Sequence, residues 1–370
     1  MKCYICGNEK FVSILNKEPI NIWTGSSDND THREYRFECR LFQCLSCSHI
    51  QQNITEELEE ILHRTYESVH AQVSTPIGMG EWGKKRGDYI LNKLNLNNHK
   101  TALEIGCANG YLLEYLKTKG FTDLVGIDPS LETNYELNGI TYMKKFACAG
   151  LALNKKFDLI LSISAFEHIK NINSIMKFVS NHLEHDGELF FLVPNCQRQL
   201  EKGDPAVFLH EHVHCYTVSS LQTLLKKNGF KINELKDVQG AYFVYAQKGK
   251  GSNVPPKINL YTSYSSKIDS TLSYISEIAN NSSVAFHGAC NSLNNILGWS
   301  DINNDFGLFD NDEMKVGKKF FRKEVRFPSK EGVNKYEYII VVPYEFFDEI
   351  EKQYLRLGYK GKIIRAVVDK

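Results

Sequence analysis

The residues best suited to chemistry lie in one short segment, which contains three histidines and a glutamate: His210, Glu211, His212 and His214. Histidine titrates near neutral pH, so such a cluster can move protons to and from a bound substrate. Alternate side chains of a strand share one face, so the His-x-His-x-His spacing would also suit a metal ion. Only Cys215 offers a further ligand nearby, and we therefore favour acid–base chemistry over a metal site.

A glycine-rich loop at residues 104–110 reads Glu-Ile-Gly-Cys-Ala-Asn-Gly and overlaps the end of an apolar run at 101–105. The run predicts a buried strand, and the residues after the loop predict a helix through Lys119. The glycines let a ligand approach the backbone where a Cβ atom would collide. Asp128 ends the next predicted strand, where a carboxylate can accept both hydroxyls of a ribose.

The chemistry of this loop indicates which nucleotide it would bind. It lacks the G-x-G-x-x-G spacing that holds a pyrophosphate against a helix N-terminus. The acidic Glu104 beside it disfavours phosphate and favours a cationic or zwitterionic ligand. S-adenosylmethionine fits, because it joins adenosine to a sulfonium and an amino-acid tail and has no phosphate.

The loop, its preceding acid and Asp128 together resemble the class I methyltransferases. The resemblance implies an α/β, Rossmann-like fold and S-adenosylmethionine as cofactor, with the methionine part beside Gly106 and Gly110 and the ribose on Asp128. The full set of expected cofactor-binding residues is Glu104, Gly106, Asn109, Gly110, Asp128 and Ser164. Residues 145–149 provide no acidic residue for the adenine, whose contact stays unassigned.

Two Glu-His pairs are candidates for catalysis. Glu167 and His168 follow a predicted strand, where class I methyltransferases commonly have a similar pair beside the cofactor. We interpret this pair as mainly architectural, with a supporting contact as the alternative. Glu211 and His212 follow the strand at 187–194 through a long loop, which places them over the carboxyl edge of the sheet, where substrates bind in open α/β folds.

Two Cys-x-x-Cys pairs near the start of the chain predict a structural zinc site. The expected ligands are Cys3, Cys6, Cys44 and Cys47. Four thiolates complete the tetrahedral coordination of zinc, so this metal would stabilise the fold and perform no chemistry. Reduced free thiols and a redox role are the alternatives. Cys39 and His49 are spare ligands, and the intervening stretch at 11–40 predicts a small sheet.

The pattern along the chain predicts three domains, namely a zinc-binding domain at 1–70, a methyltransferase domain at 71–250 and a Rossmann-like domain at 251–370. A linker is predicted at 247–256. Continuous apolar strands separated by helices indicate a parallel sheet covered on both faces. The predicted strands of the middle domain are 101–105, 124–128, 157–162 and 187–194. The last domain is predicted to contain a helix at 258–280 and strands at 283–288, 306–310, 338–343 and 361–368.

The His-Glu-His segment followed by Tyr216 and Thr217 resembles the signature of the sugar C-methyltransferases of deoxysugar pathways. That family joins the same three kinds of domain in the same order. The resemblance implies methyl transfer to carbon 3 of a nucleotide-linked 4-keto-deoxysugar, through an enolate formed by a base. His212 would be the base, with Glu211 as its partner or a substrate ligand and His210 close by. Tyr66 matches the region of an active-site tyrosine, and a packed aromatic residue is the alternative.

The chain departs from the family pattern on the acceptor side. Leu209 stands where the family usually has tyrosine, and residues 239–242 replace a His-Gly-Gly-Ser stretch. In the last domain, residues 289–292 replace an Ala-Lys-Gly turn. These changes spare the cofactor loop. A different sugar nucleotide therefore stays open, as does O-methylation with His212 deprotonating a hydroxyl.

The overall charge restricts the partners. Lys and Arg number 44 and Asp and Glu number 44, so the formal net charge is zero, which disfavours nucleic acid and anionic membranes. We expect a cytoplasmic enzyme with a small-molecule substrate, either monomeric or homo-oligomeric. An RNA-binding protein or RNA methyltransferase with a zinc module is the alternative of another class. The C-terminal domain is either an oligomerisation platform or a holder of the acceptor's nucleotide through Gly288 and Asp310.

Overall fold

The computed structural model describes residues 1–22, 35–67, 92, 100–238, 240–251, 258–313 and 315–367. The boundary predicted near residue 70 and residues 252–256 of the predicted linker lie outside these residues. The chain divides into two compact units. Unit 1 comprises Met1–Val12, Phe42–Cys196 and Glu211–Leu260, and unit 2 comprises Ser13–Leu41, Gln197–His210 and Tyr261–Lys370. The division into three domains stays a prediction.

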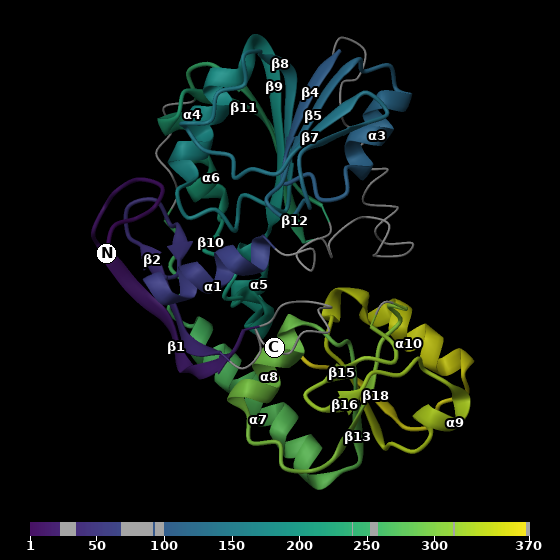
Figure 1. The fold of residues 1–370 in the computed structure, drawn as a ribbon. Coiled ribbons are helices and arrows are strands. Elements are labelled where there is room, and N and C mark those ends of the chain that lie inside the picture. The colour runs from purple at the N-terminus through teal and green to yellow at the C-terminus, as the bar shows by residue number, and fades with distance from the viewer. Residues whose placement is uncertain are drawn as a thin grey trace. The chain divides into compact units, whose positions relative to one another are not determined.

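An eight-stranded sheet forms the centre of unit 1, in the order β11-β12-β9-β8-β4-β5-β7-β6 (Figure 1). Its strands are β4 (Thr101–Ile105), β5 (Asp123–Ile127), β6 (Tyr135–Leu137), β7 (Ile140–Met143), β8 (Phe157–Ile163), β9 (Leu183–Pro194), β11 (Phe230–Val238) and β12 (Ala241–Lys248). The five strands from β9 to β7 are parallel to one another. By contrast, β12 runs antiparallel to both β9 and β11, and β6 runs antiparallel to β7. The predicted parallel sheet is confirmed in these five strands, and the antiparallel edge was not predicted.

Helices cover both faces of this sheet (Figure 1). One face is covered by α3 (Tyr111–Thr118), and the other by α4 (Ile172–His182) and α6 (Val218–Lys227). Each helix on the second face starts at a side-chain cap. Asn171 accepts a hydrogen bond from the backbone N–H of Ser174, and Thr217 forms a reciprocal capping box with Ser220. The strand order reverses between β4 and β8, which is where ligands bind in open α/β sheets.

A small sheet contains four strands in the order β1-β2-β3-β10. They are β1 (Phe11–Asn21), β2 (Arg36–Cys44), β3 (Ile50–Gln51) and β10 (His214–Cys215). The strand β3 pairs antiparallel with the end of β2 and with β10, which carries His214. The predicted sheet at 11–40 is confirmed in β1 and β2, and residues 23–34 lie outside the described residues. Helix α1 (Glu56–Tyr66) follows β3 and is capped by Thr55.

The two cysteine pairs are part of the core of unit 1. Cys3, Ile5 and Cys44 are buried in the same apolar cluster as the inner faces of α4 and α6. The amide of Asn173 on α4 donates to the carbonyl of Tyr4, and the Lys227 ammonium at the end of α6 donates to the carbonyl of Ile5. The start of the chain is therefore fixed to helices of the large sheet.

The sheet of unit 2 contains four parallel strands in the order β14-β13-β17-β18. They are β13 (Val284–His287), β14 (Phe306–Phe309), β17 (Tyr338–Val341) and β18 (Lys362–Arg365), close to the four predicted strands. The other elements placed wholly or largely in this unit are α5 (Cys196–Lys202), η4 (Pro205–Val207), α7 (Tyr264–Asn281), α8 (Asn291–Trp299), β15 (Lys319–Phe320), β16 (Lys323–Glu324), α9 (Lys330–Val333), η5 (Tyr344–Phe346) and α10 (Phe347–Arg356). The helix predicted at 258–280 begins later, at Tyr264. None of the helices among the described residues has the length and apolar character needed to span a bilayer.

Candidate functional site

The predicted cofactor loop lies at the carboxyl end of β4, beside the reversal of strand order. Gly106 has φ +78°, and its N–H donates to the carbonyl of Ile127, 2.8 Å away. A Cβ atom at Gly106 would lie 2.6 Å from Cβ of Ala165, in the segment after β8. Ala108 also has a positive φ, +45°, which is uncommon for a residue with a side chain and is often found at functional sites. The loop is held tightly against the segment that carries Glu167 and His168.

Gly110 has a packing role that the sequence did not reveal. It caps α3 with φ +76°, and a Cβ atom there would lie 2.3 Å from the hydroxyl oxygen of Tyr142. The space beside Gly110 is therefore filled by a phenol ring from β7. The side-chain oxygen of Asn109 accepts from the backbone N–H of Tyr111 at 3.3 Å, within the same turn. These two residues shape the loop through contacts within the protein.

Asp128 follows β5 and organises the cofactor loop. Its Oδ2 accepts from the backbone N–H of Ala108 at 2.8 Å, and its Oδ1 accepts from the N–H and hydroxyl of Ser130 at 2.8 and 2.6 Å. An ionised carboxylate has about four lone-pair sites, so further hydrogen bonds can still be accepted. The residue is largely buried, with 9% of its surface exposed. It can hold the loop and accept ribose hydroxyls at the same time.

Glu104 is a buried acid beneath this loop. Only 4% of it is exposed, and burial followed by repulsion from Asp128 raises the pKa of its carboxyl well above the ordinary value. Among the residues that the structure describes, its Oε2 has no hydrogen-bond partner. A buried carboxyl oxygen without a partner costs free energy unless a ligand satisfies it. A positively charged group of a ligand would do so, so Glu104 fits the zwitterionic S-adenosylmethionine.

Ser164 begins the segment that connects the cofactor loop to the histidines. It has φ +51°, and its N–H donates to the carbonyl of Leu192 at 2.9 Å. Three residues later, the same segment presents Glu167 and His168. A strained residue at the carboxyl end of β8 thus turns the chain from the sheet toward the candidate catalytic groups.

Five of the side chains lie together in unit 1: Tyr66, Glu167, His168, Glu211 and His212. Nδ1 of His168 lies 3.1 Å from the Tyr66 hydroxyl and 3.1 Å from the carbonyl oxygen of Glu211. Carboxylate oxygens of Glu167 and Glu211 each lie 4.0 Å from a ring nitrogen of His168. The rings of His168 and His212 meet edge to face, with centroids 4.9 Å apart. Both Glu-His pairs therefore belong to one cluster, with His168 at its centre.

Burial gives these groups different protonation behaviour. It lowers the pKa of His168 to about 4 and, together with the neighbouring His168, lowers the pKa of His212 well below its ordinary value. Burial raises the pKa of Glu211 to about 7. Burial and the charges of Glu211 and Glu167 raise the pKa of Tyr66, which stays protonated. At neutral pH the cluster therefore contains neutral imidazoles, able to accept a proton, beside a carboxyl that can donate one.

The three alternating histidines have separate partners. His210 belongs to unit 2, where its Nε2 lies 3.3 Å from the carbonyl oxygen of Phe37. In unit 1, both ring nitrogens of His214 have partners, in His49 and in the carbonyl of Ile169, each at 2.9 Å. Among the described residues, neither ring nitrogen of His212 has a hydrogen-bond partner. Of these three histidines, only His212 belongs to the cluster around His168. The three alternating histidines therefore do not form a metal site together.

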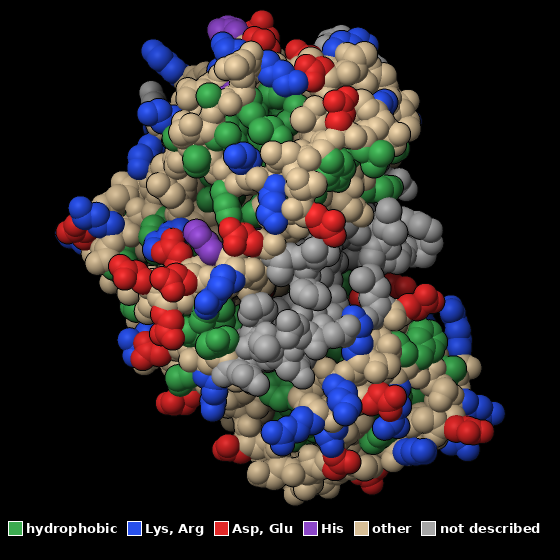
Figure 2. Space-filling model, in the orientation of Figure 1, with side chains coloured by type: hydrophobic (Ala, Val, Ile, Leu, Met, Phe, Trp, Pro, Cys, Tyr) green, Lys and Arg blue, Asp and Glu red, His purple; other side chains and the backbone are tan. Residues whose placement is uncertain are grey.

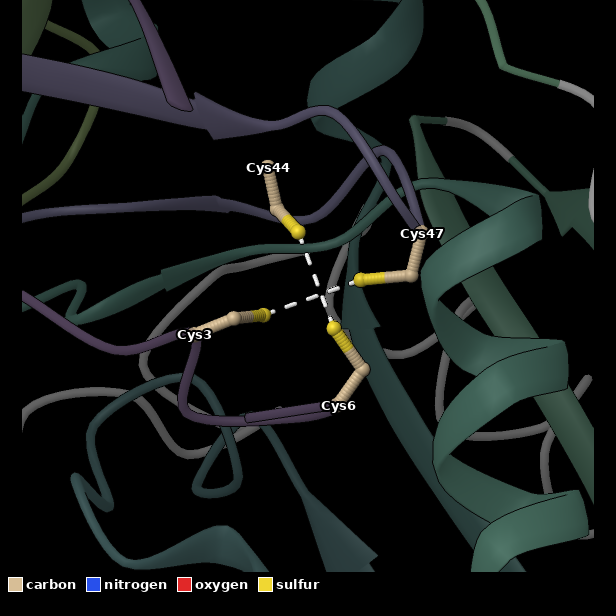
Figure 3. A group of neighbouring side chains, drawn as sticks. All are labelled: Cys3, Cys6, Cys44 and Cys47. Atoms are coloured by element: carbon tan, nitrogen blue, oxygen red, sulfur yellow. Dashed lines mark hydrogen bonds between the residues drawn. The ribbon is translucent and has the colours of Figure 1, made fainter. Parts of the chain in front are cut away.

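Two groups of side chains have the composition of a metal site. In the first, the sulfurs of Cys3 and Cys47, and those of Cys6 and Cys44, are 3.6 Å apart and point toward a common centre (Figure 3). Zinc–sulfur bonds of about 2.3 Å require sulfurs about 3.8 Å apart in a tetrahedron, whereas a disulfide would need about 2.05 Å. The four thiols therefore already have the spacing of a zinc site.

The second group contains Glu167, His168 and His212, with ligand atoms within 4.8 Å of one another. Bonds of about 2.1 Å from zinc to nitrogen or oxygen require ligand atoms about 3.4 Å apart. The Nε2 of His168 lies 4.0 Å from Oε1 of Glu167, so this group is too open to be a preformed metal site. The spare ligands named from the sequence, Cys39 and His49, are in neither group.

Comparison with known proteins agrees with this geometry. Residues 80–235 match the family model described as a methyltransferase domain. The sheet order and the parallel central strands are those of the class I, Rossmann-like methyltransferase fold.

Individual relatives match only part of the chain, or match it at low sequence identity. The chain is similar to C-methyltransferase NovU of Streptomyces niveus, with 23% identity over 259 residues, which are 66% of this chain and 59% of that protein. It is also similar to a ubiquinone biosynthesis O-methyltransferase of Actinobacillus pleuropneumoniae, with 32% identity over 123 residues, which are 30% of this chain and 52% of that protein. A solved S-adenosylmethionine-dependent methyltransferase of Listeria monocytogenes superposes with a TM-score of 0.37 and 21% identity, covering 45% of this chain and all of that one. The chain thus spans less than two thirds of the two curated relatives.

Proposed function

We propose that this protein is a methyltransferase that uses S-adenosylmethionine to methylate a carbon beside a ketone, in a nucleotide-linked 4-keto-deoxysugar. The observation that carries the proposal is the cluster of Tyr66, Glu167, His168, Glu211 and His212. The segment that carries Glu167 and His168 packs against Gly106 of the cofactor loop through Ala165. The similarity to a C-methyltransferase supports transfer to carbon. The His-Glu-His segment supports carbon 3 of the sugar as the acceptor.

The residues of the cluster suit enolate chemistry. His212 is neutral and has no hydrogen-bond partner among the described residues, so its lone pair can take the proton on the carbon next to the ketone. Protonated Glu211 and the Tyr66 hydroxyl are donors that can stabilise the developing enolate oxygen. The carboxylate of Glu167, 4.0 Å from His168, offsets positive charge that the imidazoles acquire.

The cofactor side has a separate set of residues. When bound, S-adenosylmethionine supplies an activated methyl group, so the protein needs neither a covalent nucleophile nor a catalytic metal for the transfer. Asp128 would accept the ribose hydroxyls, and Glu104 would face the charged amino-acid end. Gly106 lets the loop pack against Ala165, so a cofactor held by this loop would lie beside the segment that carries Glu167 and His168.

We propose further that the four cysteines Cys3, Cys6, Cys44 and Cys47 bind structural zinc. The proposal is supported by sulfur–sulfur distances of 3.6 Å and by the burial of Cys3, Cys44 and Cys47. With four protein ligands the coordination is complete, so zinc would stabilise the turns and take no part in methyl transfer.

The decisive experiment supplies a panel of 4-keto-deoxysugar nucleotides and measures the mass of the product and the release of S-adenosylhomocysteine. In deuterated water, the carbon 3 proton should exchange with solvent, and His212→Asn should abolish this exchange together with turnover. His185→Asn is the matched control, because the His185 side chain is 93% exposed and its partner among the described residues is the neighbouring Asp186. Turnover of His212→Asn at the wild-type rate would remove His212 from the mechanism.

O-methylation is the second candidate, supported by the similarity to an O-methyltransferase. His212 would then take the proton of a hydroxyl. A 4-hydroxy sugar nucleotide methylated as readily as the ketone would favour this candidate. A nucleic-acid substrate is less suited to the surface, because basic and acidic side chains are intermixed on the face drawn in Figure 2 and the net charge is zero.

A further inference from the structure

Two buried histidines of unit 1, His49 and His214, take no part in the proposed chemistry. Both are fully buried. Nε2 of His49 lies 2.9 Å from Nδ1 of His214, and Nε2 of His214 lies 2.9 Å from the carbonyl oxygen of Ile169. The ring of Tyr216 stacks on His214 at an interplanar angle of 25°. These two buried imidazoles thus form a chain of hydrogen bonds that leads to the backbone next to His168.

The carbonyl of Ile169 determines the direction of these hydrogen bonds. A carbonyl only accepts, so Nε2 of His214 carries the hydrogen. Burial lowers the pKa of His214 to about 4, so the ring is neutral and its Nδ1 is an acceptor. His49 must therefore donate through its own Nε2. Its Nδ1 has no hydrogen-bond partner among the described residues, so nothing competes for the opposite side of the ring.

His214 and Tyr216 together hold three of the four carbonyls at 166–169. The Tyr216 hydroxyl donates to the carbonyl of Phe166 at 3.1 Å, and the backbone N–H of His214 donates to that of Glu167 at 3.1 Å. Nε2 of His214 donates to the carbonyl of Ile169. The carbonyls on both sides of His168 are therefore fixed by this pair of residues.

We propose that His49 and His214 form a positioning relay that fixes the segment carrying Glu167 and His168 in the geometry needed for proton transfer. The consequence for turnover rests on the proposed function, whereas the geometry of the relay does not. The relay begins beside the turn at residues 44–47, which carries Cys44 and Cys47, because the N–H of Cys44 donates to the carbonyl of His49 at 2.8 Å. The turn that carries two of the four thiols thereby also supports the catalytic segment.

Two variants of His49 separate the hydrogen bond from the packing. Gln in His49→Gln can place an amide N–H near the position of Nε2, whereas His49→Leu fills the space and removes the donor. His49→Leu leaves Nδ1 of His214 buried and unsatisfied, so its ring is free to turn away from Ile169. A third variant, His182→Leu, removes another buried imidazole of unit 1, which is bonded to Phe178 and Leu153 and lies outside the relay.

The direct test is a long-range ¹H–¹⁵N spectrum of the histidine rings in the full-length protein without substrate. His49 and His214 should both carry a hydrogen on Nε2, and Nδ1 of His214 should act as the acceptor. The ring signals of His168 should move in His49→Leu and keep their wild-type positions in His49→Gln and His182→Leu. A hydrogen on Nδ1 of His214, or unchanged His168 signals in His49→Leu, would overturn the relay even if the sugar substrate were wrong.

Turnover gives the second readout, with whichever acceptor the wild-type enzyme methylates. A displaced catalytic group should lower kcat about 10- to 100-fold in His49→Leu. The KM for S-adenosylmethionine should stay unchanged, and His49→Gln should restore most of kcat. Loss of kcat in His182→Leu to the same extent would show that general destabilisation explains the effect, and the relay would be rejected.

Discussion

Units 1 and 2 contain the same turn with different chemistry around it. Gly106 and Gly288 each end a central strand and donate, at 2.8 Å, to the carbonyl of the last residue of the next strand. Asp128 and Asp310 each accept a backbone N–H of the glycine loop at 2.8 Å. The strand orders agree as well, since β5-β4-β8-β9 corresponds to β14-β13-β17-β18.

The two turns differ in the residues that would meet a ligand. The buried acid two residues before Gly106 is Glu104, and the corresponding residue before Gly288 is Phe286. Asp310 also has an ammonium partner, because Nζ of Lys315 lies 3.4 Å from its Oδ2. The turn of unit 1 therefore has two acids, Glu104 and Asp128, that could face a cationic ligand. In the turn of unit 2, Phe286 replaces the first acid and the second, Asp310, already faces the Lys315 ammonium. We therefore expect the same backbone geometry to suit a cationic ligand better in unit 1 than in unit 2.

The largest expected effect comes from the two aspartates. Asp128→Asn should weaken S-adenosylmethionine binding roughly 100-fold, because it weakens two charge-assisted hydrogen bonds worth about 1.5 kcal/mol each. Asp310→Asn should leave that affinity within about twofold. Isothermal titration calorimetry of both variants measures the contrast. Equal losses would show that the two turns do not differ as described.

The second effect is on stability, at the glycine of unit 2. Gly288 has φ +114°, and a Cβ atom there would lie 2.6 Å from Cδ of the rigid Pro343 ring. Gly288→Ala should lower the free energy of unfolding by about 2 kcal/mol through strain and overlap. Gly317→Ala, with φ +84° and nothing within 4 Å, should cost only the backbone strain. Urea denaturation compares the two, and an equal cost would mean that the overlap relaxes freely.

A smaller effect is expected at Glu104, which has no acidic counterpart in unit 2. Glu104→Gln should weaken S-adenosylmethionine binding about tenfold, because it removes a carboxyl that can ionise when it faces the cationic ligand. The raised pKa of Glu104 also makes stability depend on pH. The native state keeps this proton where the unfolded chain has lost it, so stability falls as pH rises from the ordinary carboxyl pKa toward the raised one.

Urea denaturation at pH 5 and pH 8 isolates this contribution. The wild type should lose more stability between these values than Glu104→Gln, which has no proton to lose at that position. The same loss in both proteins would mean that the Glu104 carboxyl does not titrate in this range.

The smallest effect is expected from the ion pair of unit 2. Lys315→Met should lower stability by less than about 1 kcal/mol, since the pair is partly exposed and methionine keeps the apolar contacts. It should also leave S-adenosylmethionine binding unchanged. Differential scanning calorimetry and titration calorimetry measure the two quantities. Tighter binding of S-adenosylmethionine in this variant would reveal that Lys315 had been closing a second site.

Local patterns made the two α/β sheets predictable. Apolar runs ending in glycine or aspartate predicted β4, β5 and β13 to within a residue or two, because buried parallel strands need continuous apolar residues. The edge strand β11 lacks that simple signal, because its residues have mixed polarity, and the apolar run of β12 does not reveal that this strand is antiparallel to its neighbours. Burial of both faces of a strand is thus easier to read in a sequence than an edge position.

The candidate site was predictable in its residue types and only partly in its partners. Tyr66, Glu211 and His212 were named from the sequence, and the structure brings them together. The central place of His168 was missed, because adjacency across three distant segments leaves no trace in local spacing. A repeated Glu-His pair was the only signal. His49 likewise reads as a spare metal ligand until its partner His214, 165 residues away, is known.

The cysteine turns and the large sheet share one hydrophobic core, which limits where the chain can be truncated. Cys3 and Ile5 contribute to the apolar cluster under α4 and α6, and Lys227 binds the carbonyl of Ile5. A recombinant fragment starting after residue 70 would therefore expose part of the hydrophobic interior and lose Tyr66 and His49. Such a fragment should aggregate or fold poorly, so catalytic studies require the chain from its first cysteine onward.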